Sequence, residues 1–134
     1  MISNEMFGSG IIKIKINGYL KNNTENERLE ISTTGIKNKN KITFLDNDIK
    51  YTIKINKNEV YLLREGKDFF NSFVFNEKKS VSSYFLKENS YSLDLEIITS
   101  YICINEDTIH VIYKVVESDC DYEFKIGMSG TIWV

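Results

Sequence analysis

The length, composition and charge of the chain restrict the classes of protein to which it can belong. Its 134 residues are enough for one domain, and a hydrophobic content of 42% is too high for a disordered chain. A net charge of −2 disfavours a surface built to neutralise phosphates, so we expect no nucleic-acid partner. No apolar run is long enough for a membrane helix, so we expect no membrane partner.

The N-terminal stretch and the two cysteines indicate a cytoplasmic protein. The stretch MISNEMFGSG lacks lysine, arginine and an apolar core, and so does not resemble a secretory signal. We expect residues 1–10 to be a mobile segment of a single domain that spans residues 1–134. Cys103 and Cys120 form no CxxC or Cys/His spacing, which is typical of free cytoplasmic cysteines. Because no residues have the spacing of metal ligands, we predict no metal and no cofactor.

Alternation of apolar and polar residues predicts β-strands along most of the chain. In IIKIKINGYL (11–20) the residues alternate between isoleucine and lysine or asparagine, which is the pattern of a half-buried strand. The stretch EVYLLREGKDFFNSFVF (59–75) reads as two strands around a glycine turn. The period of two recurs in 51–56, 91–101 and 121–130. Within 91–101 it places Thr99 and Tyr101 on one face, and no stretch has the period of a helix.

Clusters of Asn, Asp, Ser and Gly separate these strands at regular intervals. The predicted turns are 22–27, 33–35, 46–48, 56–58, 65–68, 76–79, 87–90, 105–108 and 117–121. Such short connections predict an all-β, antiparallel up-and-down meander of about eight to ten strands. Because open edges are costly, we expect the sheet to close into one barrel, with a two-sheet β-sandwich as the alternative. Gly127 and Gly130 predict a bulge or a sharp bend in the last strand.

The order of four of these stretches resembles the YwiB-like family of bacterial proteins. The stretches are TIKINKNEVYLLREG (52–66), FVF (73–75), SSY (82–84) and LEIIT (95–99). The resemblance covers roughly residues 42–134 and departs from the family at LKENSYS (86–92), where members tend to carry a proline and a glycine. It implies a lipocalin-like (calycin) β-barrel. Because the family has no established activity, the resemblance implies a fold more than a function.

Arg64 ends the apolar pattern of residues 59–65 and is the principal candidate for a ligand site. Val60, Leu62 and Arg64 share one face of the predicted strand, and the family resemblance favours this face as the inner one. An inward guanidinium suits a carboxylate or a phosphate. Two alternatives stay open: Arg64 pairs with a carboxylate or carbonyls of the barrel, or the strand ends at Leu63 and Arg64 is solvated.

The other candidate residues of a site inside the barrel are hydroxyl-bearing and aromatic residues of further strands. They are Tyr84, Thr99, Tyr113 and Phe124. Together with Arg64 they predict a pocket for a small apolar or anionic molecule.

The alternative function is a filled barrel that acts as a protein-interaction or homodimerisation module without a ligand. Ile98, Ile102 and Ile112 fall on the nominally polar faces of their strands and motivate this alternative, because an apolar patch marks an interface. The protein is thus expected to be a monomer or a homodimer. An enzyme ranks third: His110 is the sole histidine and is expected to point outward, so a Ser/His or Cys/His nucleophile pair has little support.

Overall fold

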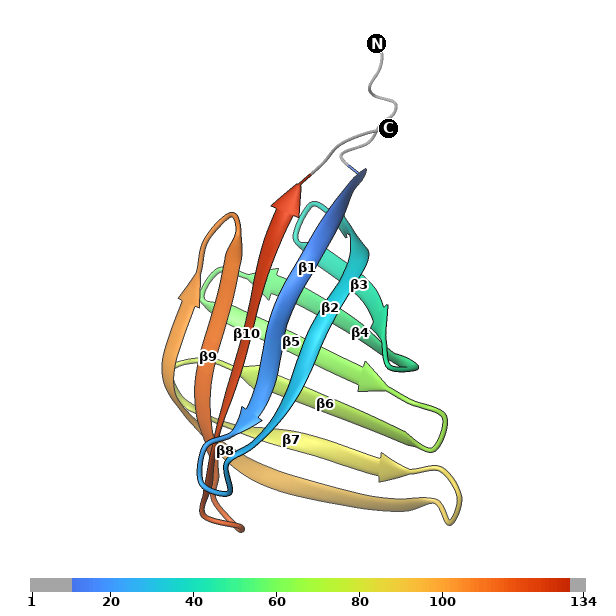
Figure 1. The fold of residues 1–134 in the computed structure, drawn as a ribbon. Coiled ribbons are helices and arrows are strands. Elements are labelled where there is room, and N and C mark those ends of the chain that lie inside the picture. The colour runs from blue at the N-terminus through green and yellow to red at the C-terminus, as the bar shows by residue number, and fades with distance from the viewer. Residues whose placement is uncertain (1–10, 131–134) are drawn as a thin grey trace.

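The structure is a computed structural model that describes residues 11–130, and these residues form ten strands and no helix (Figure 1). The strands are β1 (Ile11–Asn22), β2 (Glu27–Asn38), β3 (Lys41–Asp46), β4 (Ile49–Asn56), β5 (Glu59–Glu65), β6 (Phe69–Phe75), β7 (Lys79–Leu86), β8 (Tyr91–Ile104), β9 (Thr108–Val115) and β10 (Cys120–Gly130). The described residues include no helix that could cross a membrane. Residues 1–10, predicted above to be a mobile N-terminal segment, lie outside the described residues.

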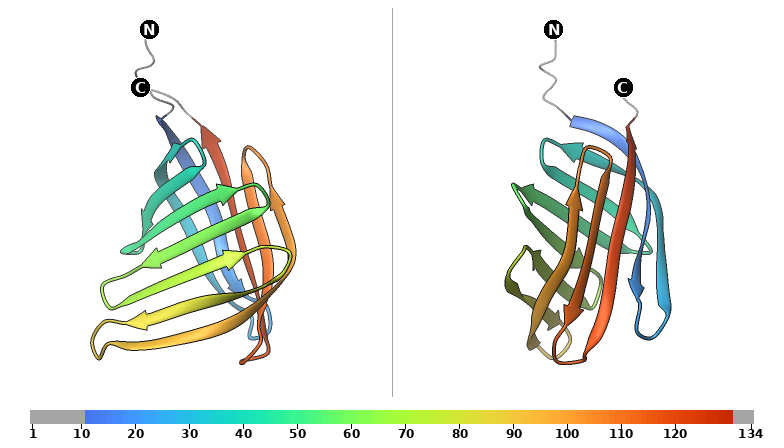
Figure 2. Two further views of the ribbon diagram at one scale, coloured as in Figure 1. Left: turned by 180° about the vertical axis from the view of Figure 1, so that it is seen from behind. Right: turned by 90° about the vertical axis from the view of Figure 1, so that its left-hand side faces the viewer.

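Each strand pairs in antiparallel orientation with the next one along the chain, and the last strand returns to the first. β10 pairs with β1 without interruption from Ile14↔Gly130 to Asn22↔Tyr122, and this ladder closes the sheet. Two further views show the strands winding around a single interior (Figure 2). The predicted up-and-down barrel is therefore confirmed, and the alternative of a two-sheet sandwich is wrong.

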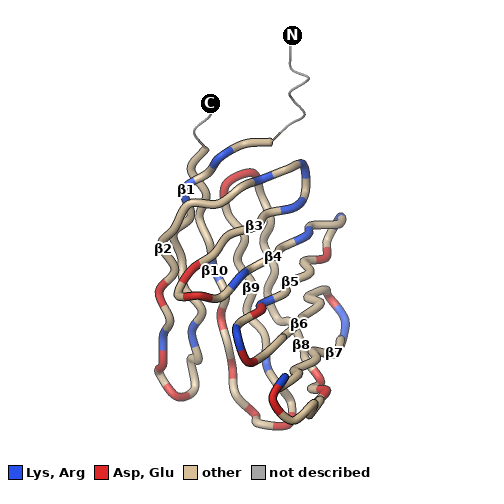
Figure 3. The backbone as a smooth tube through the Cα atoms, turned by 90° about the vertical axis from the view of Figure 1, so that its right-hand side faces the viewer, with Lys and Arg blue, Asp and Glu red and all other residues tan. Residues whose placement is uncertain are grey.

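Most turns lie where polar residues cluster, with one exception. Non-glycine residues of positive φ occupy five of the predicted turns, for example Asn26, Lys57 and Ser90. The predicted turn TTG (33–35) instead lies within β2, because two β-branched threonines suit a strand better than a turn. β2 ends at Asn38, and the turn that follows begins at Lys39, whose φ is 58°. Basic and acidic residues are interspersed along the turns and the strands (Figure 3).

The barrel is filled at one end. The side chains that point into the barrel at this end are fully or almost fully buried, and they form one hydrophobic core. Its fully buried members include Ile16, Ile53, Val60, Phe75, Val111, Phe124 and Ile126. Burial of such branched and aromatic side chains is the main source of stability in a domain of this size.

A bulge in β8 changes which residues of that strand face the core. The pairing of β8 with β9 shifts register between Thr99 and Tyr101. Beyond the bulge Tyr101 lies outside, with 47% of its surface exposed, and Ile102 packs against the core. The prediction that Tyr101 shares a face with Thr99 is therefore wrong, and so is the prediction of an exposed Ile102. Ile98 and Ile112 do lie on the outer face, the first exposed and the second half-buried.

The glycines of β10 do not form the predicted bulge. Gly127 pairs in continuous register with Asn17 of β1 and with Thr108 of β9. Gly130 is likewise the partner of Ile14 in an unbroken ladder. The register shift thus lies in the pairing of β8 with β9 and not in the ladders of β10.

Candidate functional site at the open end of the barrel

The end of the barrel at which β5 turns into β6 and β7 turns into β8 is less completely filled. Inward positions become more exposed along the strands that lead to it. On β8, Ile97 is fully buried, Leu95 is half-buried, and Leu93 is 41% exposed. On β5, Val60 and Leu62 are buried and Arg64 is half-buried. We call this end of the barrel the open end, and the sequence-predicted Arg64 lies on its inner wall.

Arg64 belongs to a row of inward side chains that crosses six consecutive strands. Successive pairs in this row are directly opposite each other in neighbouring strands of the sheet. The row consists of Phe44, Tyr51, Arg64, Asn71, Tyr84 and Leu93. The alternation of β5 dictates this placement, because Arg64 is in phase with the buried Val60 and Leu62. The alternative in which the strand ends before Arg64 is therefore wrong, since β5 continues to Glu65.

The Arg64 guanidinium is surrounded by aromatic rings and not by acidic groups. Its carbon atom Cζ lies 5.5 Å from the centre of the Tyr51 ring and 5.6 Å from that of Phe69. The Nε atom is buried without a hydrogen-bond partner. Within residues 11–130 no carboxylate approaches the guanidinium to within ion-pair distance. The alternative in which a carboxylate of the barrel neutralises Arg64 therefore has no support in the described residues.

Two further side chains contribute hydroxyl groups that have no partner. The Tyr51 hydroxyl and the Thr99 Oγ1 are buried and form no hydrogen bond in the described structure. Since a buried polar group without a partner costs about 1–3 kcal/mol, such groups in a native fold call for an explanation. Tyr51 lies directly opposite Arg64 in the neighbouring strand, so a partnerless hydroxyl and a positive charge come from adjacent positions of the row.

Tyr113 and Thr99 lie side by side on β9 and β8. The Tyr113 ring stacks on Tyr122 at 5.4 Å and packs against Phe75 at 4.7 Å. Burial raises the pKa of the Tyr113 hydroxyl, and the positive charge of Arg64 opposes this rise. The positive charge of Arg64 thus acts on Tyr113 across the interior, but burial outweighs it and keeps the Tyr113 hydroxyl neutral.

The structure brings together some of the predicted site residues and separates one of them. Tyr84 lies in the Arg64 row and stacks on Phe69 with the two ring planes 5° apart. Phe124 is fully buried in the filled end, opposite Val111, and is a core residue. The alternation of β10 predicts that Phe124 points inward, but it does not predict the position of Phe124 along the barrel axis.

Sequence reasoning did not single out Tyr51, Phe69 or Asn71 as site residues. Asn71 is buried, and its side-chain amide donates to the Ser83 carbonyl at 3.1 Å, so β7 fixes its position. The signal for Tyr51 was present in the sequence. A hairpin turn centred near Lys57 places position 51 opposite position 64.

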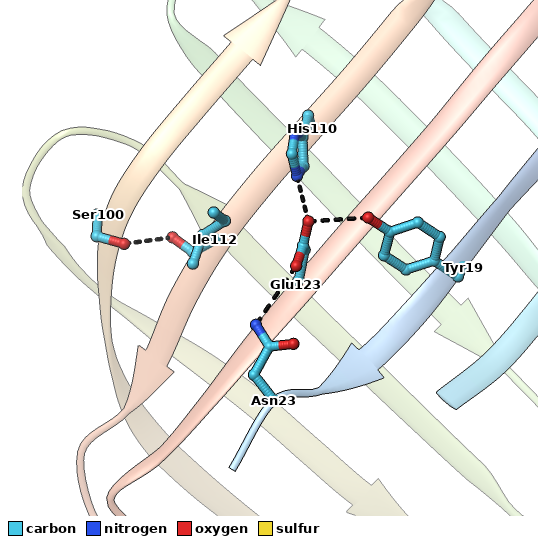
Figure 4. Close-up of polar contacts among 6 residues, drawn as sticks. All are labelled: Tyr19, Asn23, Ser100, His110, Ile112 and Glu123. Atoms are coloured by element: carbon cyan, nitrogen blue, oxygen red, sulfur yellow. Dashed lines mark hydrogen bonds and ion pairs between the residues drawn. The ribbon is translucent and has the colours of Figure 1, made fainter. Parts of the chain in front are cut away.

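A polar network lies on the outer face of β1, β9 and β10, away from the barrel interior (Figure 4). The Glu123 carboxylate accepts hydrogen bonds from the Tyr19 hydroxyl at 2.8 Å and from the Asn23 amide at 3.4 Å. His110 Nε2 lies 2.6 Å from the same carboxylate. His110 thus points outward as predicted. The network ties three strands together on the outside of the barrel.

The cysteines and a surface cleft are further features of chemical interest within residues 11–130. Both cysteines are free, and the described residues contain no group of three acidic, histidine or cysteine side chains placed to hold a metal ion. A shallow cleft beside the β8 bulge is separate from the Arg64 row. It is lined by Glu77, Thr99, Ser100, Tyr101 and Ile102.

Substitution of Glu123 with glutamine is expected to flatten the acid dependence of stability. Burial raises the pKa of Glu123, but the hydrogen bonds from His110, Tyr19 and Asn23 outweigh burial and hold the pKa below 4.5. The stability due to this ionised carboxylate is therefore present above pH 4.5 and is lost as the pH falls through the lowered value.

Urea unfolding from neutral to acidic pH measures this effect. The variant should be less stable by about 1–2 kcal/mol at neutral pH, and the difference should shrink in acid. Glu88→Gln, at an exposed position of the β7–β8 turn, removes the same charge and should show neither effect. A constant difference between Glu123→Gln and the parent over the whole pH range would contradict the argument.

The fold and the open end together define a class of protein: a closed, ten-stranded up-and-down β-barrel with one arginine on its inner wall. The crystal structure of the YwiB protein from Bacillus subtilis is similar to it, with a TM-score of 0.65 and 18% sequence identity. The similarity covers 92% of this chain and 93% of that chain. At this identity it shows a shared fold, as the sequence resemblance implied. No protein-family model and no curated protein matches the chain.

Proposed function

We propose that the protein binds a small, partly apolar anion at the open end of its barrel, with Arg64 as the partner of the negative charge. The observation that carries this proposal is the guanidinium on the inner wall that has no carboxylate and no hydrogen bond for its buried Nε. Arg64 is half-buried, and its positive charge has no acidic partner among the described residues. A bound anion would supply that partner.

The surroundings of Arg64 indicate the chemical class of the ligand. The guanidinium is a planar fork of donors that matches a carboxylate, a sulfonate or a phosphate, and the partnerless Tyr51 hydroxyl belongs to the residue opposite it. Phe69, Tyr84 and Leu93 provide apolar surface next to the charge. Sites for small molecules usually combine mostly apolar walls with a few fixed polar groups in this way.

The proposal extends to the class and location of the protein. A barrel that holds a small ligand in one open end is lipocalin-like in function as well as in architecture. The free state of Cys103 and Cys120 supports a cytoplasmic location, where thiols stay reduced. The site contains no paired nucleophile and base among the described residues, so we propose binding without catalysis.

Two fluorescent probes that differ by one charged group test the proposal. The first, 8-anilinonaphthalene-1-sulfonate, carries an anion, and the second, N-phenyl-1-naphthylamine, has the same rings without the sulfonate. The native protein should bind the sulfonate saturably, with one site per chain, and at least about tenfold more tightly than the neutral probe. Decanoate should displace it.

The thermal midpoint supplies a second measurement of the same binding. Saturating sulfonate probe should raise the midpoint, because a ligand that binds only the folded state stabilises it. Equal affinity for the two probes would contradict the role of Arg64. Absence of saturable binding by either probe would contradict the site itself.

A further inference from the structure

One edge of β2 has no neighbouring strand over most of its length. β2 pairs with β1 from Glu27 to Asn38, but β3 pairs only with Gly35–Asn38. Near Thr33, whose hydroxyl donates to the Leu45 carbonyl at 2.8 Å, the two strands begin to diverge, and the gap between β2 and the β3–β4 hairpin is visible in Figure 1. Within residues 11–130, no strand pairs with this side of residues 27–34. Their backbone N–H and C=O groups on this side are available to another chain.

This edge of β2 lacks lysine, proline and a bulge, three of the features by which sheet edges usually avoid pairing with other strands. Its charged residues are Glu27, Arg28 and Glu30. The stretch ERLEISTT (27–34) contains no lysine and no proline. Its register with β1 is unbroken, so the edge is regular. β8 differs, because its bulge at Ser100 lies where that strand continues past the last residue paired with β7.

The outer side of the β2 edge carries one positive and one negative charge, two residues apart. The Arg28 guanidinium forms an ion pair with the Glu30 carboxylate and lies over the Tyr19 ring at 4.1 Å. In an antiparallel pairing of β2 with a copy of itself about Leu29, Arg28 of each copy lies opposite Glu30 of the other. Opposite charges on directly facing residues favour such a register.

We propose that the protein forms a two-fold symmetric dimer in which the free edges of two β2 strands pair antiparallel about Leu29. The pairing joins the two barrels into a continuous sheet in which each β2 lies between its own β1 and the partner's β2. A second copy fits better than an unrelated peptide, because the charge pattern of this edge is complementary to itself. Self-complementarity is what a two-fold interface requires.

Sedimentation equilibrium of four proteins tests this dimer. The native chain should associate reversibly into dimers. Arg28→Glu and Glu30→Arg each place like charges opposite each other, and each should weaken association by at least about tenfold. The double variant Arg28→Glu/Glu30→Arg restores opposite charges across the interface and should restore the dimer. This recovery separates the pairing from any general effect of the substitutions on folding.

Three results would overturn the proposal. The first is a native chain that stays monomeric at every concentration. The second is a dimer that neither charge reversal weakens. The third comes from amide hydrogen exchange of the native chain, which needs no variant. Raising the protein concentration should slow exchange in residues 27–31, which face one another in a pairing about Leu29, and protection at another surface or at none would refute the β2 interface. The proposed binding of the sulfonate probe at the open end depends on Arg64 and not on the dimer. A failure of the dimer proposal would therefore leave the proposed binding function untouched.

Discussion

Replacing Gly18 with alanine is expected to lower the free energy of unfolding by about 3 kcal/mol or more. A β-carbon at this position would lie 2.0 Å from the Lys125 carbonyl oxygen and 2.7 Å from the Ile126 Cα. Both atoms belong to the backbone of β10, which pairs with β1 here. Relief of the clash therefore requires the two strands to separate and not merely a side chain to rotate.

Gly127 provides a matched control for this prediction. It lies on β10 opposite Asn17, one position along the same ladder. A β-carbon there would have its nearest neighbour, the Asn17 carbonyl oxygen, at 3.6 Å, which is ordinary contact. Gly127→Ala should change the free energy of unfolding by less than about 0.5–1 kcal/mol. Urea unfolding of both variants measures the difference, and equal losses would refute the close approach of β1 and β10 at Gly18.

Replacing Arg64 with methionine is expected to abolish the preference for the anionic probe without a loss of stability. The side chain makes no ion pair and no hydrogen bond within residues 11–130, so its removal leaves no charge stranded. An apolar side chain of similar length keeps the contacts with Tyr51 and Phe69. The free energy of unfolding should stay unchanged or rise by about 1–2 kcal/mol, as at many sites kept for function. Affinity for 8-anilinonaphthalene-1-sulfonate should fall to that for N-phenyl-1-naphthylamine.

Lys67→Met is the control for Arg64→Met. It removes a positive charge from the exposed β5–β6 turn, close in sequence to Arg64 but outside the inner wall. It should leave both stability and probe affinity unchanged. A loss of about 3–5 kcal/mol in Arg64→Met would show that the arginine neutralises a buried acidic group. The structural role would then replace the proposed binding role.

The strands of this protein were largely predictable because one face of each strand is buried in the barrel and the other faces solvent. The alternation of apolar and polar residues in 11–20 and 51–56 reflects these two faces directly. Thr33–Gly35 was misread as a turn because turn composition is only a correlation. The φ angle of Lys39 marks the turn that ends β2, and a propensity for that angle is weak in lysine. The alternation of residues 91–99 contains no sign of the bulge at Ser100. The inward and outward assignments of Tyr101 and Ile102, which follow the bulge, were therefore reversed.

The candidate site was less predictable than the fold, since it depends on the relation between strands. The inward direction of Arg64 followed from its phase with Leu62. Its neighbours Tyr51 and Asn71 follow only from the register of two hairpins. The depth of a residue along the barrel is set by strand tilt and stagger, which single-strand patterns do not contain. Phe124 and Tyr113 thus looked alike in the sequence, although Phe124 is a fully buried core residue and the charge of Arg64 acts on the Tyr113 hydroxyl.

The ladder between β1 and β10 has a consequence for how the chain folds. It joins the beginning of the described chain to its end, for example Ile14 to Gly130. Every other ladder forms between strands adjacent in sequence. Hairpins can therefore form early, whereas ring closure has to wait for the last strand to emerge from the ribosome. Contacts between such distant residues slow folding, and until they form, the edges of β1 and β9 are exposed to other nascent chains. The step that completes the barrel is thus also the step at which its folding is most vulnerable.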